Sequence, residues 1–234
     1  MSPKTLIIPS TLPADFANLG RDCQALEAAG ADRLQWDVMD GTYVPNITFG
    51  PDVIAACRAI CDLPFEVHVM AERPEELLER YIKQAGCELV ICHPETLGMP
   101  HRTYQQIKDW GGKVGVALSP ATPLSHVEDV MDLVDMILVM TVNPGFGGQA
   151  YLSSMEAKIT RARLLIEASG RDIDLEVDGG IGPGTIAGAA RAGANAFISG
   201  SALWTYDSFE EGVQDLRSRA EAARAKAASP TPAS

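Results

Sequence analysis

The amino-acid sequence predicts an α/β protein that folds as a single (β/α)8 barrel. Short apolar runs rich in Val, Ile and Leu recur eight times, and segments with helical spacing of apolar residues lie between them. Such alternation implies parallel strands, because parallel neighbours need a crossover connection and cannot be joined by a tight turn. Eight units within 234 residues match a closed barrel of the TIM type. An open doubly wound sheet is the alternative, but no GxGxxG fingerprint follows the first run.

The expected elements follow one another along the chain. Strands are expected at Leu6–Ile8, Leu34–Val38, Phe65–Met70, Leu89–Cys92, Val114–Leu118, Met136–Met140, Ile173–Val177 and Ala196–Ser199. Helical spacing predicts helices over Phe16–Ala29, Glu75–Ala85, Tyr151–Ala168, Thr185–Ala192 and Phe209–Ala225, with a further helix beginning at about Pro51.

The chain shows no internal linker, so we expect one barrel domain over residues 1–226. Residues 227–234 are small, polar and proline-bearing, which predicts a disordered tail. Five cysteines without a CxxC pair mostly lie in apolar runs and are expected to be reduced core residues.

Composition also restricts partners and location. A formal net charge of -12 disfavours nucleic acid as a partner, since binding to phosphates by charge pairing needs clustered Lys and Arg. No apolar run is long enough to span a membrane and no secretion signal is evident, so we expect a cytoplasmic protein that does not bind membranes. An anionic substrate would have to be held by backbone dipoles.

Polar residues close several of the apolar runs, where barrel enzymes place their active sites. Strands two and seven lie three steps apart around the ring, which predicts that Asp37 and Asp178 face one substrate from two sides. Inverting a carbon beside a carbonyl requires a proton to leave one face and another to arrive at the opposite face. Each Asp could instead cap the next helix, but the long loop after Asp37 places a cap badly. The closing polar residues are Ser10, Asp37, His68, Asn143, Asp178 and Ser201.

Glycines follow the last three strands and predict a phosphate-binding cradle. Asn143–Gln149 (NPGFGGQ), Asp178–Gly180 and Gly200–Ser201 supply backbone N–H groups without a Cβ in the way. A single glycine pair would read as an ordinary tight turn, but three adjacent loops favour anion binding.

The motifs PSTLPADFANLG, WDVMDGTYVPNITFGP, VHVM, GVALSPATPL, VMTVNPGFGGQAY, LEVDGGI and GSALW resemble those of the ribulose-phosphate 3-epimerase family in order and spacing, from about Ile8 to Trp204. The resemblance implies an enzyme that interconverts D-ribulose 5-phosphate and D-xylulose 5-phosphate through an enediolate. It implies that Asp37 is the general base and Asp178 the general acid, that His68 binds metal and contacts substrate, and that a homo-oligomer forms. The implied substrate-contacting residues are Ser10, His68, Met39, Met70, Met140, Gly145, Phe146, Gly147, Gly148, Gly179, Gly180, Gly200 and Ser201.

Family members use one divalent ion, zinc, iron, manganese or cobalt, but this chain departs from the family pattern at Gln35. The pattern has a metal-binding His two residues before the base, and an amide oxygen is a weaker donor for a transition metal. We expect Asp37, His68 and Asp178 to remain as ligands, with reduced affinity. In a rival arrangement the site holds no metal and Gln35 donates a hydrogen bond to the enediolate.

The sequence is compatible with other interpretations of the site. The enzyme could act on a ketose phosphate of another chain length, or the barrel could bind a sugar phosphate without catalysis. Glu66 and Glu176 are expected to face the barrel interior, where they either orient ligands or are satisfied interior polar groups. His93, His101 and His126 have no evident partners and are taken as structural or exposed.

Overall fold

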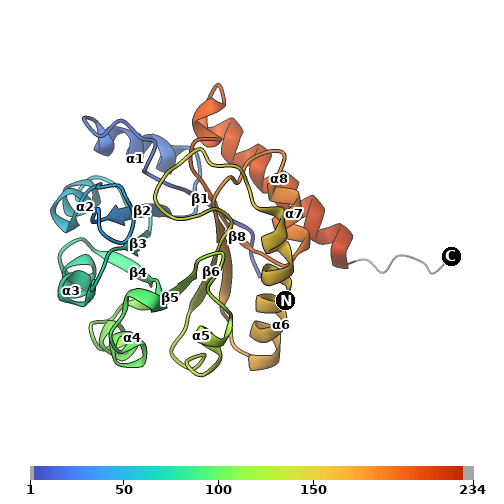
Figure 1. Ribbon diagram of the computed structural model, residues 1–234. Coiled ribbons are helices and arrows are strands. Elements are labelled where there is room, and N and C mark those ends of the chain that lie inside the picture. The colour runs from blue at the N-terminus through green and yellow to red at the C-terminus, as the bar shows by residue number, and fades with distance from the viewer. Residues whose placement is uncertain (1–2, 229–234) are drawn as a thin grey trace.

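The computed structural model describes residues 3–228, which form a ring of parallel strands surrounded by helices (Figure 1). The sheet order is β1-β8-β7-β6-β5-β4-β3-β2, and every paired strand is parallel to its neighbour. The (β/α)8 barrel expected from the sequence is therefore confirmed. The strands are β1 (Leu6–Pro9), β2 (Leu34–Met39), β3 (Phe65–Met70), β4 (Cys87–Cys92), β5 (Lys113–Leu118), β6 (Met136–Met140), β7 (Asp174–Asp178) and β8 (Ala196–Ser199).

The helices match the expected segments except where they are short or polar. The expected Phe16–Ala29 and Tyr151–Ala168 begin later, and the helices over 100–109 and 125–128 were not anticipated because one is mostly polar and the other spans four residues. The helices are α1 (Leu19–Ala28), α2 (Pro51–Arg58), α3 (Glu75–Lys83), α4 (Pro100–Asp109), α5 (Ser125–Glu128), α6 (Glu156–Ser169), α7 (Ile186–Arg191) and α8 (Phe209–Ala228), with 3-10 turns at Pro94–Thr96, Ser153–Met155 and Leu203–Thr205.

The two largest hydrophobic cores lie on the two faces of the strands. Outward-facing strand residues such as Trp36 and Phe65 pack with helix residues such as Tyr81 in the larger core. A smaller core inside the ring includes Ile91 and Leu138. Strands covered on both faces are typical of parallel sheets, and alternate residues point to opposite faces. With Trp36 facing outward, Gln35 and Asp37 face the barrel interior.

The barrel closes loosely between β1 and β2. Ser10 and Gln35 form an isolated parallel bridge there, and the backbone N–H of Thr11 donates to the Gln35 carbonyl at 3.0 Å. This seam places Ser10 beside the carboxyl end of β2, above the inward-facing Asp37.

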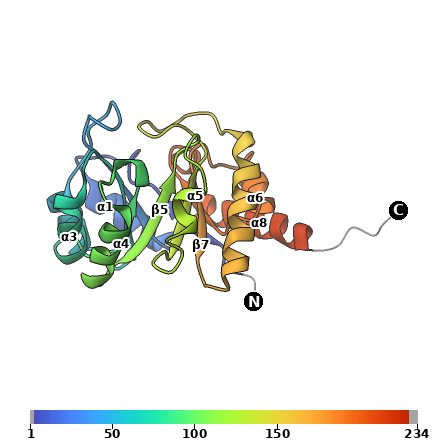
Figure 2. The same ribbon diagram turned by 60° about the horizontal axis from the view of Figure 1, so that its bottom comes forward.

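Two long loops lie at the carboxyl ends of the strands, on the upper side of the barrel in Figure 2. One joins β2 to α2, and the other joins β6 to α6. They meet where the Asn46 side-chain amide donates to the carbonyl of Gly145 at 3.0 Å. The carboxyl end is thereby partly roofed, whereas the opposite end carries shorter turns.

The C-terminal helix is longer than expected, whereas the cysteines agree with the expectation. The predicted tail begins at Ala227, but α8 continues to Ala228 because the Ala-rich segment there favours helix; residues 229–234 lie outside the described residues. All five cysteines are buried and free, as expected. Within residues 3–228, no helix combines the length and the apolar character needed to cross a bilayer.

Candidate active site

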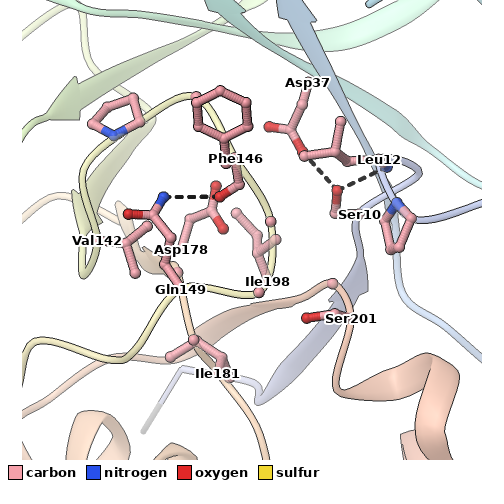
Figure 3. Close-up of a pocket in the computed structure, with 18 of the residues that line it drawn as sticks. Ser10, Leu12, Asp37, Val142, Phe146, Gln149, Asp178, Ile181, Ile198 and Ser201 are labelled. Carbon is pink, nitrogen blue, oxygen red and sulfur yellow. Dashed lines mark hydrogen bonds between the residues drawn. The ribbon is translucent and has the colours of Figure 1, made fainter. Parts of the chain in front are cut away.

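A cavity of about 570 Å³ opens at the carboxyl ends of the strands (Figure 3). It is where the sequence places the chemistry, and no Lys or Arg lines it. Two predicted residues, His68 and Gln35, do not line it; they are fully buried and lie beside the carboxylates. The predicted residues that line the cavity are Ser10, Asp37, Met39, Met70, Met140, Asn143, Gly145, Phe146, Gly147, Gly148, Asp178, Gly179, Gly180, Gly200 and Ser201.

The glycine loops after β6, β7 and β8 come together on one side of the cavity. Gly180 has φ +65°, and a Cβ there would lie 2.7 Å from the backbone nitrogen of Tyr151, so only glycine fits. A Cβ at Gly148 would lie 4.0 Å from Ser201 Oγ, which shows how near the first and third loops are. The loop after β6 is further fixed by Gln149, whose amide donates to the carbonyls of Asn143 and Phe146.

These loops offer backbone donors to the cavity. Within residues 3–228, the backbone N–H groups of Gly147, Gly148, Gly180 and Ser201 donate to no protein acceptor. Unpaired N–H groups around a glycine-lined hollow favour an anion without requiring a cationic side chain. The arrangement fits a phosphate group and is compatible with the acidic net charge of the chain.

The two carboxylates lie on the other side of the cavity, from β2 and β7. Ser10 Oγ donates to Asp37 Oδ2 at 2.6 Å, a contact drawn in Figure 3. The amide nitrogen of Gln35 donates to Asp37 Oδ1 at 2.8 Å and to Asp178 Oδ2 at 3.1 Å. The carboxylates are therefore joined by one side chain and lie closer together than positions on opposite sides of the mouth would suggest.

Asp178 and His68 have shifted proton affinities. Burial raises the pKa of the Asp178 carboxyl; hydrogen bonds from His68 and Gln35 oppose this rise, and the charge of Asp37 adds to it. Burial would lower the pKa of His68, but the hydrogen bonds and charges of Asp178 and Asp37 outweigh it and raise that pKa to about 9. Asp178 and His68 thus both bind a proton more tightly than the free side chains do.

Asp37, His68 and Asp178 also fit a divalent cation. Each offers one donor atom, and the three atoms lie within 4.8 Å of one another. His68 Nδ1 is 3.1 Å from Asp37 Oδ1 and 3.6 Å from Asp178 Oδ2, distances usual between two ligands of one ion with bonds of about 2.1 Å. Two carboxylates and one imidazole suit zinc, iron, manganese or cobalt.

Gln35 does not complete this donor set as an amide oxygen ligand. Its nitrogen faces the two carboxylates, while its buried Oε1 has no hydrogen-bond partner among the described residues. Asp37, His68 and Asp178 could therefore hold an ion without Gln35, which forms a hydrogen-bonding bridge beside them.

The expectation that His93 has no partners was wrong. His93 is fully buried, its Nε2 lies 2.8 Å from His68 Nε2, and its Nδ1 lies 3.1 Å from Ser119 Oγ. Burial lowers the pKa of His93 to about 4, although the nearby Glu95 opposes this effect. His101 and His126 are exposed, as expected. A signal for His93 exists in the sequence, because it follows β4 on the inward face, two residues after Ile91, which pairs with His68.

Glu66 and Glu176 face the barrel interior below the site, as expected. Arg33 lies near Glu66, with Nη1 3.5 Å from Oε2, but both oxygens of Glu176 are without a hydrogen-bond partner in the described part of the chain. Burial raises the pKa of Glu66 to about 7 and that of Glu176 well above its ordinary value. No hydrogen bond joins either group to the metal-ligand candidates within residues 3–228, so the ligand-orienting role gains no support.

Several apolar residues complete the cavity and were not singled out from the sequence. Leu12, in the loop after β1, packs beside Met39 and Met70. Ile198 on β8 lies two residues before Gly200, a spacing that would have indicated its inward position. The other unanticipated lining residues are Pro13, Val142, Ile181, Ala202 and Thr205, whereas Pro144 and Gln149 belong to the predicted cradle loop.

Comparison with known proteins agrees with this geometry. Residues 6–204 match the ribulose-phosphate 3-epimerase family. The chloroplastic ribulose-5-phosphate-3-epimerase of Arabidopsis thaliana is 44% identical over 91% of this chain and 76% of its own. The ribulose-phosphate 3-epimerases of Bacillus subtilis (42% identical, 90% of this chain, 97% of that relative) and Escherichia coli K12 (43%, 91% and 95%) are similarly related.

Solved structures with low sequence identity share the fold. A 3-hexulose-6-phosphate synthase aligns with a TM-score of 0.63 at 19% identity, over 92% of this chain and 99% of that one. Phosphoribosyl anthranilate isomerase from Thermus thermophilus aligns with a TM-score of 0.62 at 18% identity, over 93% and 98%. These likenesses show the barrel fold, and the sequence match carries the assignment further. The chain belongs to the ribulose-phosphate 3-epimerase family.

Proposed function

We propose that this protein is an epimerase that interconverts D-ribulose 5-phosphate and D-xylulose 5-phosphate by inverting C3. The observation that carries the proposal is the pair of carboxylates, Asp37 and Asp178, joined through Gln35 at one side of a cavity whose other side is a glycine cradle. The curated relatives named above are all ribulose-phosphate 3-epimerases and align over most of this chain.

In the proposed reaction the glycine loops bind the substrate phosphate. Backbone N–H groups of Gly147, Gly148, Gly180 and Ser201 would donate to its oxygens, while Met39, Met70 and Met140 line the space for the carbon chain. An anchored phosphate holds C3 between the carboxylates, and such positioning lowers the entropic part of the barrier.

Asp37 is proposed as the base that removes the C3 proton, and Asp178 as the acid that returns one from the other face. Ser10 and Gln35 both donate to Asp37, which orients its oxygens. The raised pKa of Asp178 suits an acid, since a carboxyl that retains its proton can deliver it. In the reverse direction the two groups exchange roles.

Asp37, His68 and Asp178 would hold one divalent cation, which when bound supplies Lewis-acid stabilisation of the negative charge that develops on the substrate oxygens. His68 would orient this group from the buried side. The identity of the metal is a proposal limited to the ions that accept carboxylate and imidazole donors, namely zinc, iron, manganese and cobalt.

The test is a coupled assay of the purified protein with D-ribulose 5-phosphate, run with and without chelator and with metal content determined. We expect D-xylulose 5-phosphate to form, and we expect chelation to reduce the rate. No product under any metal condition would reject the proposal. Full activity in metal-free protein would instead favour the arrangement in which Gln35 donates to the enediolate, and faster turnover of another ketose phosphate would change the substrate.

Assembly and location remain predictions. A homo-oligomer is expected, and light scattering after size-exclusion chromatography measures it. A cytoplasmic location is expected too, and fractionation of cells with an antibody against the protein tests it; the Arabidopsis relative is named as chloroplastic.

A further inference from the structure

A second imidazole, His93, lies directly behind His68 at the end of β4. The two Nε2 atoms are 2.8 Å apart, the ring centroids are 5.0 Å apart, and neither side chain is exposed. Two ring nitrogens at this distance form a hydrogen bond only when one carries a proton and the other offers a lone pair. One of the two rings must therefore donate its Nε2 proton to the other.

The groups around His93 Nδ1 determine which ring is the donor. His93 Nδ1 lies 3.1 Å from Ser119 Oγ and 3.6 Å from Glu95 Oε1. An ionised carboxylate is only an acceptor, so it favours a proton on Nδ1 of His93. That leaves the Nε2 lone pair of His93 to accept from His68. His68 then keeps a proton on Nε2, and the Nδ1 that faces the oxygens of Asp37 and Asp178 is the nitrogen whose proton a bound cation would replace.

Glu95 is itself held in place. Its Oε1 accepts from Tyr43 OH at 3.0 Å and from Thr122 Oγ1 at 2.9 Å. Lys158 Nζ donates to three carbonyls of the loop after β5, including that of Ser119 at 3.0 Å, and so fixes the segment that carries Ser119 and Thr122. The acceptors around His93 are therefore built into three loops at the mouth of the barrel.

Tyr43 covers this group from the loop after β2. Its ring centroid lies 5.1 Å from that of His93, and its hydroxyl also contacts Ser119 Oγ at 3.2 Å. The loop that follows β2 thus covers His93, and because both imidazoles are fully buried, water does not compete for their shared hydrogen bond.

We infer that His93, oriented by Glu95, is a positioning residue that fixes His68 in the tautomer with a free Nδ1 lone pair, the form that binds the divalent cation. The inference rests on the cation site of the proposed function. Histidine ligands commonly donate their second N–H to such an acceptor, and loss of the acceptor typically costs about 10- to 100-fold in metal affinity.

The first test observes the tautomers in the unaltered protein. The zinc-loaded protein, labelled with ¹⁵N-histidine, is examined by long-range ¹H–¹⁵N NMR. We expect His68 protonated on Nε2, His93 protonated on Nδ1, and a scalar coupling across the N–H···N hydrogen bond. A proton on His68 Nδ1 or on His93 Nε2 would overturn the inference, and so would zinc that leaves the His68 signals unchanged.

The second test compares variants by calorimetric titration of the metal-free protein with Mn²⁺. His93→Phe keeps a ring but removes the acceptor, and we expect its Kd to rise about 10- to 100-fold. His93→Gln retains an acceptor oxygen and should recover much of the Mn²⁺ affinity. The Kd of Glu95→Gln should lie between those of wild type and His93→Phe. His101→Phe removes an exposed histidine and serves as the matched control, with an unchanged Kd.

Binding of inorganic phosphate to the glycine cradle serves as the check that each variant is folded. An unchanged Mn²⁺ Kd in folded His93→Phe would refute the positioning role. If His93→Phe does not fold, Glu95→Gln and the NMR tautomers decide the matter. Wild-type protein that binds zinc with the expected tautomers but epimerises nothing would reject the proposed function and leave the role of His93 intact.

Discussion

Gln35 and Asp178 are 143 positions apart in the sequence, yet the amide nitrogen of Gln35 donates to Asp178 Oδ2 at 3.1 Å. The same nitrogen donates to Asp37 Oδ1 at 2.8 Å. An amide NH₂ group has two protons, so one neutral side chain satisfies one oxygen of each carboxylate. His68 Nδ1 approaches the same two oxygens, which makes Gln35 and His68 alternative bridges between the proposed base and acid.

Replacing this bridge with an imidazole should strengthen metal binding. In Gln35→His a fourth protein donor joins Asp37, His68 and Asp178, and transition metals bind imidazole better than an amide. We expect the Kd for Zn²⁺ of the metal-free protein to fall about tenfold or more, a change of the size that ligand surroundings usually produce. Gln105→His adds an exposed histidine far from the site and is the control. Equal zinc affinity in wild type and Gln35→His would contradict the prediction.

Asp178→Asn tests the proposed acid. The amide cannot deliver a proton, so kcat should fall about 100- to 10,000-fold, the usual contribution of an acid–base group. Binding of inorganic phosphate should not change, because the cradle lies in other residues. Asp62→Asn alters an exposed carboxylate and should retain wild-type kcat. An active Asp178→Asn enzyme would remove Asp178 from its proposed role.

Metal binding should release a proton from His68. The pKa of His68 is raised to about 9, so at neutral pH the metal-free ring is protonated, and a ligand must be deprotonated. Below about pH 9 the apparent affinity should therefore rise about tenfold per pH unit from this group alone. Calorimetry in buffers of different ionisation enthalpy counts the released protons. A pH-independent affinity between about pH 6 and about pH 8 would show that His68 is not a ligand.

The strands and the two carboxylates were predictable from local pattern. Asp37 lies near the end of one apolar run and Asp178 ends another, and alternation along a strand fixes which face a residue takes. The glycine loops were predictable for a similar reason, because Gly179 and Gly180 follow β7 directly. Helices were missed where the segment is short, as in the four residues of α5.

The orientation of Gln35 and the contacts of His93 could not be predicted because they depend on distant groups. The amide of Gln35 turns its nitrogen toward a carboxylate of β7, and nothing near it in the chain specifies that choice. His93 meets His68 from β3 and Ser119 from the end of β5. Spacing identified the inward face of Gln35 and could have done so for His93, but only the closed barrel determines which side chains meet.

The phosphate cradle can be tested at Gly180 with a matched control. Both Gly180 and Gly170 have positive φ, +65° and +66°, so alanine strains either backbone by about 1 to 2 kcal/mol. At Gly180 the new Cβ would also lie 2.7 Å from Tyr151 N, whereas at Gly170 nothing lies within 4 Å. Gly180→Ala should weaken phosphate binding about tenfold or more and raise KM, a loss of roughly one hydrogen bond to a charged group. Gly170→Ala should lose stability alone. Equal phosphate affinity in the two variants would place the phosphate elsewhere.

Glu66 should make the protein less stable as the pH rises. Burial raises the pKa of Glu66 to about 7 from an ordinary value of 4.5, although Arg33 opposes the shift. The folded state therefore binds more protons than the unfolded state between these values, so this group's stabilisation is complete below the lower value and is lost as pH rises through the higher one. Glu66→Gln stays neutral and should flatten the decline in the free energy of unfolding between about pH 5 and about pH 8, measured by urea denaturation. Glu176 has a pKa raised in the same direction, so a residual slope should persist. Glu79→Gln, an exposed control, should keep the full wild-type slope, and an identical slope in Glu66→Gln would mean that Glu66 titrates normally.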